Sequence, residues 1–390
     1  MSLRVLHCPT AVGGNPPALS RALSRLGADS QCVTLAPNPF GYPVDEDLSG
    51  RGWLRREFAR WNLIRRALRE YDVIHYNFGT TLAPLRSRLG GKRWLAPAAV
   101  IHNLLYALPF EMCDLRWAAR RGKVVAVTFQ GDDARVGEVA RRYPIHFAHE
   151  VEPGYYTAET DRNTRRRTAA FARYADLVYV LNPDLLTVLP ERAQFQGYCS
   201  VDVDDWQPTP RAARPPEPWR VVHAPSHRAV KGTRHVIAAV NRLREQGVNV
   251  ELILIENMTH AEARRVYATA DLAIDQVLAG FYGALAVELM ALAVPVICYL
   301  RDDDLGCLPA AMRAELPLIN ATPDSLPAVL QEWLGAGSDQ LSARGRASRE
   351  FVRRWHQPRE IARQVLTDYE VAWNQKRATR PIRAAAVAAM

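Results

Sequence analysis

Two successive series of alternating strand and helix patterns run through the sequence and restrict it to a small set of folds. Short continuous apolar runs, typical of strands buried in parallel sheets, alternate with stretches of helical period. The strand runs are, in order, Leu3–His7, Val33–Leu35, Asp72–Tyr76, Val124–Phe129, Leu177–Leu181, Arg220–Ala224, Val250–Ile255, Leu272–Ile274 and Val294–Tyr299. The pattern predicts an α/β protein made of two doubly wound, Rossmann-like domains that face a central cleft.

A proline-rich stretch separates the two series. Pro208–Trp219 holds five prolines in twelve residues and shows little periodicity, which is typical of a linker. The length of 390 residues also favours two cores over one. We therefore expect one domain over residues 1–207 and a second over residues 220–358. A helical pattern over residues 359–376 is expected to return and complete the first domain.

The net charge of +9 bears on the partners of the chain. Fifty basic side chains face 41 acidic ones, and only four of the fifty are lysine. Attraction to phosphates or to anionic lipid headgroups is one explanation, and the codon composition of a GC-rich genome is the other. The basic residues are not interleaved with aromatic ones in a recognised module, so we expect no nucleic-acid partner.

The cysteines and the apolar segments indicate a cytoplasmic protein. The six cysteines are scattered, without a close pair at metal-ligand or redox spacing, as expected in a reducing compartment. No signal-peptide pattern opens the sequence. Val277–Leu300 is long and apolar enough for a membrane span, but it contains Glu288 and Pro295. A buried helix followed by a buried strand accounts for both residues.

The stretch from Ala270 to Tyr299 carries the strongest functional signal. A short strand ends at Ile274, and after a loop a helix begins near Gly283. The first turn of such a helix offers unpaired N–H groups and a positive dipole end to an anion. Glu288 lies early in this helix, where its carboxylate could accept hydrogen bonds from sugar hydroxyls. A structural ion pair is the alternative for Glu288.

A second candidate anion site lies where the strand ending near Ala224 gives way to a helix. Lys231 is followed by Gly232 at the start of that helix, which combines a point charge with backbone N–H donors suited to a diphosphate. Ser226 and Arg228 lie in the same loop and are further candidates. For Lys231, a position on a solvated surface is the alternative.

Polar residues at the ends of strands in the first half are candidates for the opposite wall of the cleft. Gly13 and Gly14 form a turn between a strand and a helix, and His75 lies near the end of a strand. Gln130 can donate a hydrogen bond to a hydroxyl but cannot titrate. Asp132 could contact an acceptor hydroxyl, or it could cap the turn that follows.

Taken together, these residues resemble the retaining glycosyltransferases of family 4, which have the GT-B fold. The donor-site pattern of that family is matched in order by Ala270–Asp271, Gly283, Glu288, Met290–Ala291 and Pro295–Ile297. The resemblance implies that Glu288 holds the ribose of the nucleotide. It also implies that Lys231 and Gly232 hold the donor diphosphate, that residues 220–358 form the donor domain and that residues 1–207 form the acceptor side.

The chain departs from the family at one important position. Gly280 stands where the family has its first Glu, which contacts the donor sugar near the transferred carbon. Asp275 with Gln276, together with Tyr282 and Gly283, could provide a variant solution, and a loop cap is the alternative for Asp275. Retention or inversion is left open by this departure.

The resemblance implies transfer of a hexose-type sugar from a nucleoside-diphosphate sugar to a hydroxyl acceptor in a polysaccharide, glycolipid or small-molecule glycoside. It implies no metal and no further cofactor, because Lys231 and helix-start amides would neutralise the leaving diphosphate. Asp302–Asp304 follows a strand of the second series and is expected to be a solvated loop. Two other functions stay open: a catalytically silent nucleotide-sugar-binding protein, and a GT-B-fold epimerase or hydrolase with acid–base groups in the cleft.

Two apolar segments raise the question of a membrane. The arginine-rich helical pattern over residues 51–70 places Leu54, Phe58, Trp61 and Leu68 on one face. That face and the apolar stretch Trp94–Phe110 could rest peripherally on an anionic membrane that carries a lipid-linked acceptor. Packing of both against the core is the alternative.

Overall fold

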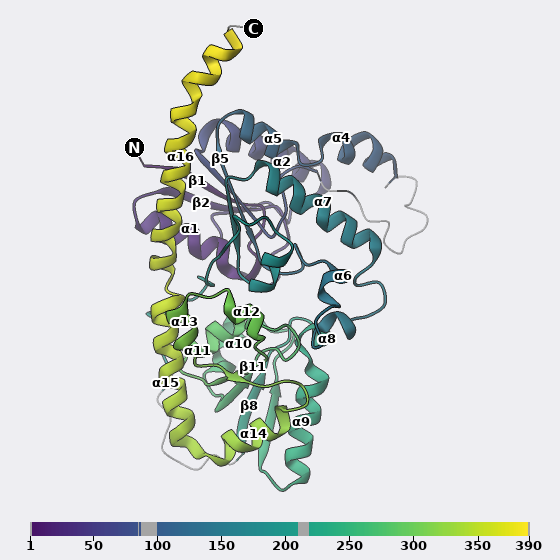
Figure 1. Cartoon of the computed structure of the whole chain (residues 1–390), viewed down its shortest axis with the longest axis vertical. Coiled ribbons are helices and arrows are strands. Elements are labelled where there is room, and N and C mark those ends of the chain that lie inside the picture. Colours follow the sequence, from purple (N-terminus) through teal and green to yellow (C-terminus); the bar gives the residue numbers. More distant parts are fainter. Residues whose placement is uncertain (1, 85, 87–99, 210–217, 389–390) are drawn as a thin grey trace.

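The computed structural model describes residues 2–84, 86, 100–209 and 218–388 and contains two parallel β-sheets, one from each half of the chain (Figure 1). Most of the stretch predicted as the linker lies outside these residues. So does the part of the predicted apolar stretch from Trp94 up to residue 99. The two α/β series expected from the sequence are both present.

The first sheet has seven strands in the order β3-β2-β1-β4-β5-β6-β7, and all neighbouring strands are parallel. The strands are β1 (Arg4–Cys8), β2 (Asp29–Thr34), β3 (Glu46–Asp47), β4 (Val73–Asn77), β5 (Val124–Phe129), β6 (Leu177–Val180) and β7 (Gln194–Phe195). Strands β4 and β5 are buried over their whole length. Their apolar side chains point alternately into the two layers of helices, as expected of a central parallel strand.

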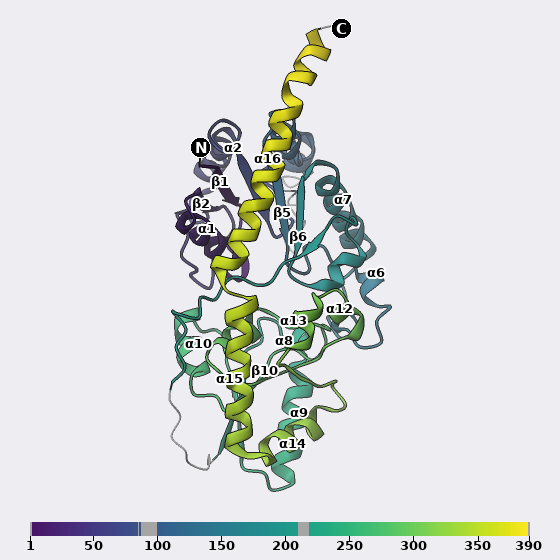
Figure 2. The same cartoon turned by 60° about the vertical axis from the view of Figure 1, so that its left-hand side comes forward.

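Helices cover both faces of this sheet (Figures 1 and 2). Helices α2, α5 and α7 pack on one face, and α1 packs on the other. The helical elements of this half are η1 (Val12–Gly14), α1 (Asn15–Arg25), α2 (Trp53–Glu70), the π-helix η3 (Asn103–Ala107), α4 (Leu108–Phe110), α5 (Cys113–Arg120), α6 (Gly137–Ala140), η4 (Phe147–His149), α7 (Ala158–Tyr174) and η5 (Pro183–Thr187).

The second sheet has five parallel strands in the order β12-β11-β10-β8-β9. Its elements are β8 (Trp219–His223), α8 (Arg228–Lys231), α9 (Thr233–Glu245), β9 (Val250–Leu254), α10 (His260–Tyr267), β10 (Leu272–Ile274), α11 (Ala284–Ala291), β11 (Val296–Cys298), α12 (Asp302–Gly306), α13 (Ala310–Ala314), β12 (Ile319–Asn320), α14 (Leu326–Gly335) and α15 (Gly337–Trp355). The apolar stretch that imitates a membrane span is α11 followed by β11, as predicted. Among the described residues, no helix has both the length and the apolar character needed to cross a bilayer.

The final helix, α16 (Pro358–Ala388), leaves the second half and runs along the first sheet beside α1 (Figure 2). Ala362, Val365, Tyr369 and Ala372 are buried there, in one cluster with side chains of α1, β1 and β5. The sequence pattern over residues 359–376 predicts a helix here, because its apolar residues recur at helical spacing.

One stretch of the first half packs against the second sheet. Phe147 and Tyr156 are buried in one apolar cluster with side chains of α9 and β10. The backbone N–H of Phe147 donates to the carbonyl oxygen of Leu278 at 3.2 Å, and Glu150 pairs with His235 of α9 at 2.8 Å. The connection between β5 and α7 therefore joins the two α/β units on one side of the space between them.

Candidate functional site

A pocket of about 240 Å³ lies between the two α/β units. Helix α1 and the turn before it supply one wall, and α10 and α11 of the second unit supply the other. Its lining residues are Gly14, Pro17, Ala18, Arg21, Ala22, Arg25, Tyr42, Pro43, Ser200, Asp202, Asp205, Trp206, His260, Arg264, Glu288 and Pro358. The sequence-predicted residues Gly14 and Glu288 thus come from opposite walls of one pocket.

Glu288 is held in this pocket by a histidine. Its Oε1 lies 2.8 Å from Nε2 of His260, and the side chain of Glu288 is only 6% exposed. The hydrogen bond to Glu288 raises the pKa of His260, although partial burial opposes that shift. His260 therefore fixes the orientation of the carboxylate, which suits a group that accepts hydrogen bonds from hydroxyls.

Aromatic rings complete this end of the pocket. The ring of His260 lies 5.2 Å from that of Tyr42 and 5.7 Å from that of Trp206. The guanidinium of Arg264 lies over the Trp206 ring at 4.3 Å. Flat apolar surfaces beside a carboxylate and arginines provide stacking together with polar contacts, the combination that a nucleoside requires.

Lys231 ends α8, directly before Gly232 and α9, and its Nζ lies near Gly283, the residue before α11. Its Nζ donates to Oδ1 of Asp275 at 2.7 Å and to Oε1 of Gln276 at 2.8 Å. The other carboxylate oxygen of Asp275 accepts from the backbone N–H of Gly283 at 2.7 Å. Lysine has three donors, so one stays available for an anion beyond these two contacts.

Asp275 therefore connects the two parts of the sequence that were predicted separately. Its carboxylate is fully buried and joins the cation of α8 to the first residue before α11. Asp275 caps the loop by accepting from the Gly283 N–H, and it also contacts Lys231. The Asp275 carboxylate thus already balances part of the positive charge of Lys231 that a bound diphosphate would use.

The remaining candidate residues of the loop before α9 differ in how freely they could contact a bound diphosphate. Gly232 adopts a φ of +76°, and a Cβ there would lie 2.5 Å from a methyl carbon of Val277, so only glycine fits. Ser226 is exposed. Arg228 pairs through two hydrogen bonds with Glu256, at 2.8 and 2.5 Å. Arg228 therefore reaches a diphosphate only if it leaves Glu256.

The glycine turn of the first unit lies beside Gln130. Gly13 and Gly14 have φ values of +64° and +69°, and a Cβ on Gly14 would lie 2.9 Å from the ring of Tyr42. A Cβ on Gly13 would lie 3.4 Å from Oε1 of Gln130. Nε2 of Gln130 is buried and has no hydrogen-bond partner among the described residues. It is thus an amide donor at the wall where a hydroxyl was predicted to bind.

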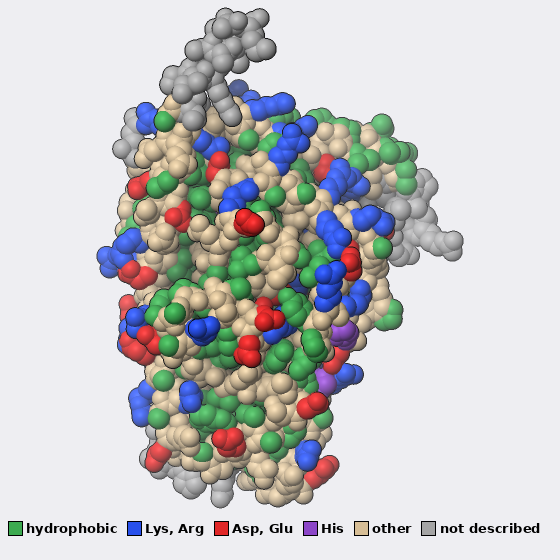
Figure 3. Space-filling view, in the orientation of Figure 1, with side chains coloured by type: hydrophobic (Ala, Val, Ile, Leu, Met, Phe, Trp, Pro, Cys, Tyr) green, Lys and Arg blue, Asp and Glu red, His purple; other side chains and the backbone are tan. Residues whose placement is uncertain are grey.

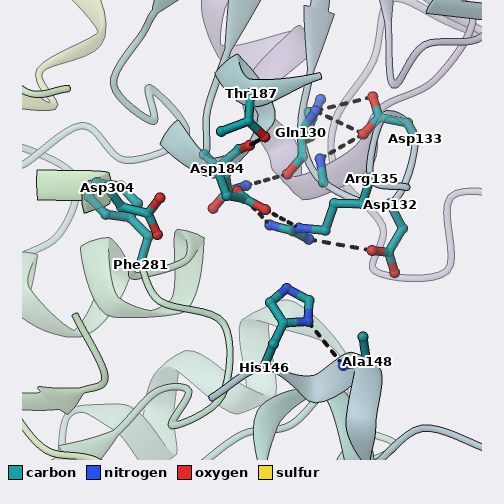
Figure 4. A network of polar contacts seen from close by, with 12 residues as sticks. Gln130, Asp132, Asp133, Arg135, His146, Ala148, Asp184, Thr187, Phe281 and Asp304 are labelled. Atoms are coloured by element: carbon teal, nitrogen blue, oxygen red, sulfur yellow. Dashed lines mark hydrogen bonds and ion pairs between the residues drawn. The ribbon is translucent and has the colours of Figure 1, made fainter. Parts of the chain in front are cut away.

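Asp132 is tied into a network next to Gln130 (Figure 4). It accepts hydrogen bonds from the hydroxyls of Tyr155 and Tyr156, and it lies 3.4 Å from Arg135. Arg135 also pairs with Asp184, with Nε at 2.6 Å from Oδ2. These contacts occupy both carboxylate oxygens of Asp132, so it is poorly placed to take a proton from a substrate.

The position of the missing Glu is filled from another element. Gly280 has a φ of +81°, and a Cβ there would lie 2.5 Å from the guanidinium of Arg301 and 2.8 Å from Oδ2 of Asp304. Arg301 pairs with Asp304 at 3.0 Å and lies over the ring of Tyr143. Figure 4 shows Asp304 across from Asp184, on the side of Phe281. A carboxylate and a guanidinium thus occupy the space that a side chain at Gly280 would need.

Asp304 corrects the prediction that Asp302–Asp304 is a solvated loop. The segment forms helix α12, and the Asp304 side chain is almost fully buried. Burial raises the pKa of Asp304 to about 7, and the charge of Asp184 adds to this, whereas Arg301 and Arg135 lower it. Sequence alone missed this residue because three consecutive Asp residues resemble a surface loop.

His75 is not placed as predicted. It lies in the middle of β4 and is fully buried, with Nδ1 at 2.5 Å from the Tyr369 hydroxyl and Nε2 at 2.7 Å from Oγ1 of Thr128. Burial, with a smaller contribution from His7, lowers its pKa well below the ordinary value. Helix α16 covers it, so it faces the core and not the cleft.

Tyr282 is also internal. Its side chain is fully buried, and its hydroxyl lies 3.0 Å from Nε2 of His356. Nδ1 of His356 in turn lies 2.9 Å from the carbonyl oxygen of Tyr198. Tyr282 therefore holds α11 against the segment that connects α15 to α16 and does not line the pocket.

Several residues of the site were missed in the sequence. No motif marks Tyr42 or His260, and only the folded chain places them, together with Trp206, beside Glu288. The one available signal was chemical: Tyr42 is a large aromatic side chain in a loop, where such residues often bind ligands. No group of three or more His, Cys, Asp or Glu side chains placed to hold a metal ion occurs in the part of the chain that the structure describes.

Solved structures of known proteins resemble this chain over nearly its whole length. No protein-family model matches it, and no curated protein matches its sequence. Sucrose-phosphate synthase from Thermosynechococcus elongatus is 15% identical with a TM-score of 0.58, over 96% of this chain and 100% of that one. HepE from Anabaena, in complex with UDP-glucose, is 13% identical with a TM-score of 0.58, over 95% and 100%.

A third similar structure is the catalytic domain of starch synthase IV from Arabidopsis thaliana, bound to ADP and acarbose. It is 13% identical with a TM-score of 0.56, over 96% of this chain and 100% of that one. At such low identity the likeness concerns the fold, and it shows that this chain has the GT-B fold, with two Rossmann-like units.

Proposed function

We propose that this protein is a glycosyltransferase that moves a sugar from a nucleoside-diphosphate sugar to a hydroxyl acceptor. The observation that carries the proposal is the pocket between the two units, in which Glu288, oriented by His260, faces the Gly14 turn. The ammonium of Lys231, the last residue of α8, lies near Gly283, the residue that precedes the helix carrying Glu288. Helix α11 thus carries a carboxylate for ribose hydroxyls, and a cation for a diphosphate lies near its first residues.

The pocket would receive the nucleoside end of the donor. Trp206, Tyr42 and His260 would contact the base and the ribose, and Glu288 would accept hydrogen bonds from ribose hydroxyls. The diphosphate would lie toward Lys231 and the amides at the start of α11. HepE was solved with UDP-glucose and starch synthase IV with ADP, so uridine and adenine nucleotides are the first donors to test.

The donor sugar would lie toward Gly280. We place Arg301 and Asp304 beside it, because they occupy the space that a side chain at Gly280 would need, and Gly280 corresponds in sequence to the first Glu of the family 4 glycosyltransferases. Gln130 would donate to a hydroxyl from the other wall, since its Nε2 is buried without a partner among the described residues. A hexose is the sugar class that this resemblance suggests.

Retention of configuration is part of the proposal. His75 is internal and Asp132 is engaged by two tyrosines, so neither is placed to take a proton from the acceptor. The leaving diphosphate, on the same face of the sugar, would accept that proton, while Lys231 and the helix-start amides stabilise its charge. No step in this scheme assigns work to a metal.

The test is a thermal-shift panel of nucleoside diphosphates and nucleotide sugars on wild type, Lys231→Ala and Glu288→Ala. Glu332→Ala, an exposed residue of α14, is the matched control. A ligand at about a hundred times its dissociation constant stabilises the folded chain by about 2.7 kcal/mol. We expect one base to shift wild type and the control, and both site variants to lose most of the response. A folded chain that no nucleotide shifts would overturn the proposal.

A silent nucleotide-sugar-binding protein is the second candidate, and one observation favours it. Asp275 already occupies the Lys231 ammonium and the Gly283 amide, which weakens the positive field available to a leaving group. Release of nucleoside diphosphate from a bound nucleotide sugar, with and without candidate acceptors, separates the two functions. Binding without release under any acceptor would favour the silent protein.

A further inference from the structure

An apolar surface with arginines at its rim lies on the first unit, away from the pocket. It is formed by the start of α2 and by the η3–α4 segment, and we call it the α2–α4 surface. Its exposed apolar side chains are Trp53, Leu54, Phe58, Val100, Ile101, Leu104, Leu105 and Leu108. Figure 3 shows hydrophobic side chains gathered over the region of α4, with Lys and Arg side chains nearby.

The two segments form one continuous surface because aromatic contacts join them. The indole N–H of Trp61 donates to the hydroxyl of Tyr106 at 2.7 Å, and the Trp61 ring lies 5.1 Å from that of Phe110. Leu54 and Phe58 precede Trp61 by seven and three residues, so they lie on the same side of α2. Leu105 adjoins Tyr106 on the neighbouring segment.

The exposure of these side chains is unusual for a soluble surface. Phe58 is 79% exposed and Leu105 is 74% exposed, although Leu63 and Ala67 of the same helix are fully buried against the sheet. Helix α2 therefore uses its second half for the core and presents the apolar side chains of its first half to solvent. Contiguous exposed apolar side chains of this size mark interaction sites.

Charge decides which partner this surface fits. A shallow groove at its edge is lined by Arg51, Leu54, Arg55 and Phe58, with both arginines exposed. Glu57, the acidic residue among them, is neutralised by Arg60 at 2.9 Å and also accepts from Tyr106. Arg51 lies 3.8 Å from Glu46 at the edge of the surface. Among the described residues, the surface thus offers apolar side chains and positive charge without an unpaired carboxylate in its centre.

Glu111, which follows α4, is neutralised as well. It lies 2.8 Å from Arg86 and 2.6 Å from Arg166. Large apolar side chains with cations at the rim match the boundary between acyl chains and anionic headgroups, where the apolar groups insert and the arginines contact phosphate.

We propose that the α2–α4 surface docks this protein peripherally on an anionic lipid bilayer. Leu54, Phe58 and Leu105 would enter the acyl boundary, and Arg51 and Arg55 would contact the headgroups. The docked surface lies on the unit that supplies the Gly14 wall of the pocket, and α16 covers the opposite face of its sheet. The proposal does not depend on the proposed transferase function, because its readout is binding to lipid.

The experiment is flotation of the whole protein with vesicles. Phosphatidylcholine vesicles are compared with vesicles that also contain phosphatidylglycerol, at low and at high salt. We expect flotation with the anionic vesicles only, and release at high salt, because exposed charges are screened beyond about 10 Å at 0.1 M salt. Equal recovery with both vesicles, or none with either, would overturn the proposal.

Substitutions test whether the α2–α4 surface is the part of the protein that binds lipid. The Leu54→Glu/Phe58→Glu variant is expected to lower partitioning at least tenfold, since each change removes a large apolar group that would be buried in the bilayer. Arg51→Ala and Arg55→Ala should each lower it roughly fivefold. Val371→Glu, an exposed apolar residue of α16 on the other face of the sheet, is the matched control and should float like wild type.

Folding and self-association are checked in the same samples. All these positions are exposed, so unchanged melting temperatures are expected, and a variant that no longer melts cooperatively is replaced by Leu105→Glu. Light scattering gives the mass of the chain without lipid. A dimer that the Leu54→Glu/Phe58→Glu variant converts to a monomer would assign the surface to self-association and overturn the lipid proposal.

Discussion

The ammonium of Lys231 lies 2.7 Å from the carboxylate of Asp275, and both groups are largely withdrawn from water. Asp275 is fully buried, and the Lys231 side chain is 12% exposed. Nζ of Lys231 would also lie 3.2 Å from a Cβ placed on Gly283. The pair therefore sits at the start of α11, so its charge balance controls how strongly that helix end attracts an anion.

The Lys231–Asp275 pair should show strong energetic coupling. Removing one partner leaves a buried charge unpaired, which typically costs about 3–5 kcal/mol, whereas removing both avoids that penalty. We expect Lys231→Met and Asp275→Asn each to lower the free energy of unfolding. The double variant should lower it by clearly less than the sum of the two single losses. Urea unfolding of the four proteins measures the coupling. Additive effects of the two single changes would contradict the pairing.

The His260–Glu288 pair predicts a pH-dependent stability. The hydrogen bond to Glu288 raises the pKa of folded His260 above its ordinary value. A group with a raised folded pKa contributes stability at low pH that is lost as the pH rises through the folded pKa. Wild type should therefore lose stability, relative to His260→Gln, as the pH rises from the ordinary histidine pKa of about 6.5 through the raised pKa of the folded chain. Urea unfolding across that range tests it, and parallel curves for the two proteins would argue against the pair.

Asp304 predicts a second pH effect, from a carboxyl group. Its pKa is raised from an ordinary value near 3.9 to about 7, mainly by burial, so the folded chain binds a proton that the unfolded chain has lost. Stability should fall as the pH rises from about 4 to about 7, at about 1.4 kcal/mol per unit as an upper limit.

Asp304→Asn removes this titration and should flatten the curve in that window, although the loss of the partner of Arg301 lowers stability at every pH. The comparison is made by thermal or urea unfolding at matched ionic strength. In the proposed transferase, the same variant should weaken binding of a nucleotide sugar more than binding of the nucleoside diphosphate alone. Equal losses for both ligands would remove Asp304 from the sugar end of the site.

Restoring a Glu at position 280 should not restore a family-like donor site. Gly280→Glu would place its Cβ 2.5 Å from the guanidinium of Arg301, in a backbone conformation with φ of +81°. Left-handed backbone costs a residue with a Cβ about 1–2 kcal/mol, before any clash is counted. We expect a lower melting temperature for Gly280→Ala and a larger loss for Gly280→Glu. Adding Arg301→Ala should recover the steric part only.

His75 should contribute to the stability of the fold but not to the binding of nucleotide. His75→Gln removes a buried hydrogen-bonded ring beneath α16 and should destabilise the fold by about 1–3 kcal/mol. It should leave the affinity for nucleotide unchanged, because the side chain faces the core. Calorimetric titration on the folded variant measures this. A large loss of affinity without a loss of stability would return His75 to the cleft.

The strands and helices were predictable because their signals are local. Buried parallel strands such as β5 are continuous apolar runs, and α16 shows its buried face at helical spacing. The helix at α11 and the strand β11 were also distinguished from a membrane span by Glu288 and Pro295 alone. These features depend only on residues that are close together in the sequence, so they can be recognised without the tertiary structure.

The sequence by itself thus determined the two α/β units, the position of Lys231 at a helix start and that of Glu288 within α11. Only the tertiary structure decided that Asp275 neutralises Lys231 from 44 positions away, that His260 orients Glu288, and that α16 covers His75. The physical reason is that periodicity reports which face of an element is buried. The partner that covers it depends on strand order and on the path of the chain between elements, and neither leaves a local pattern.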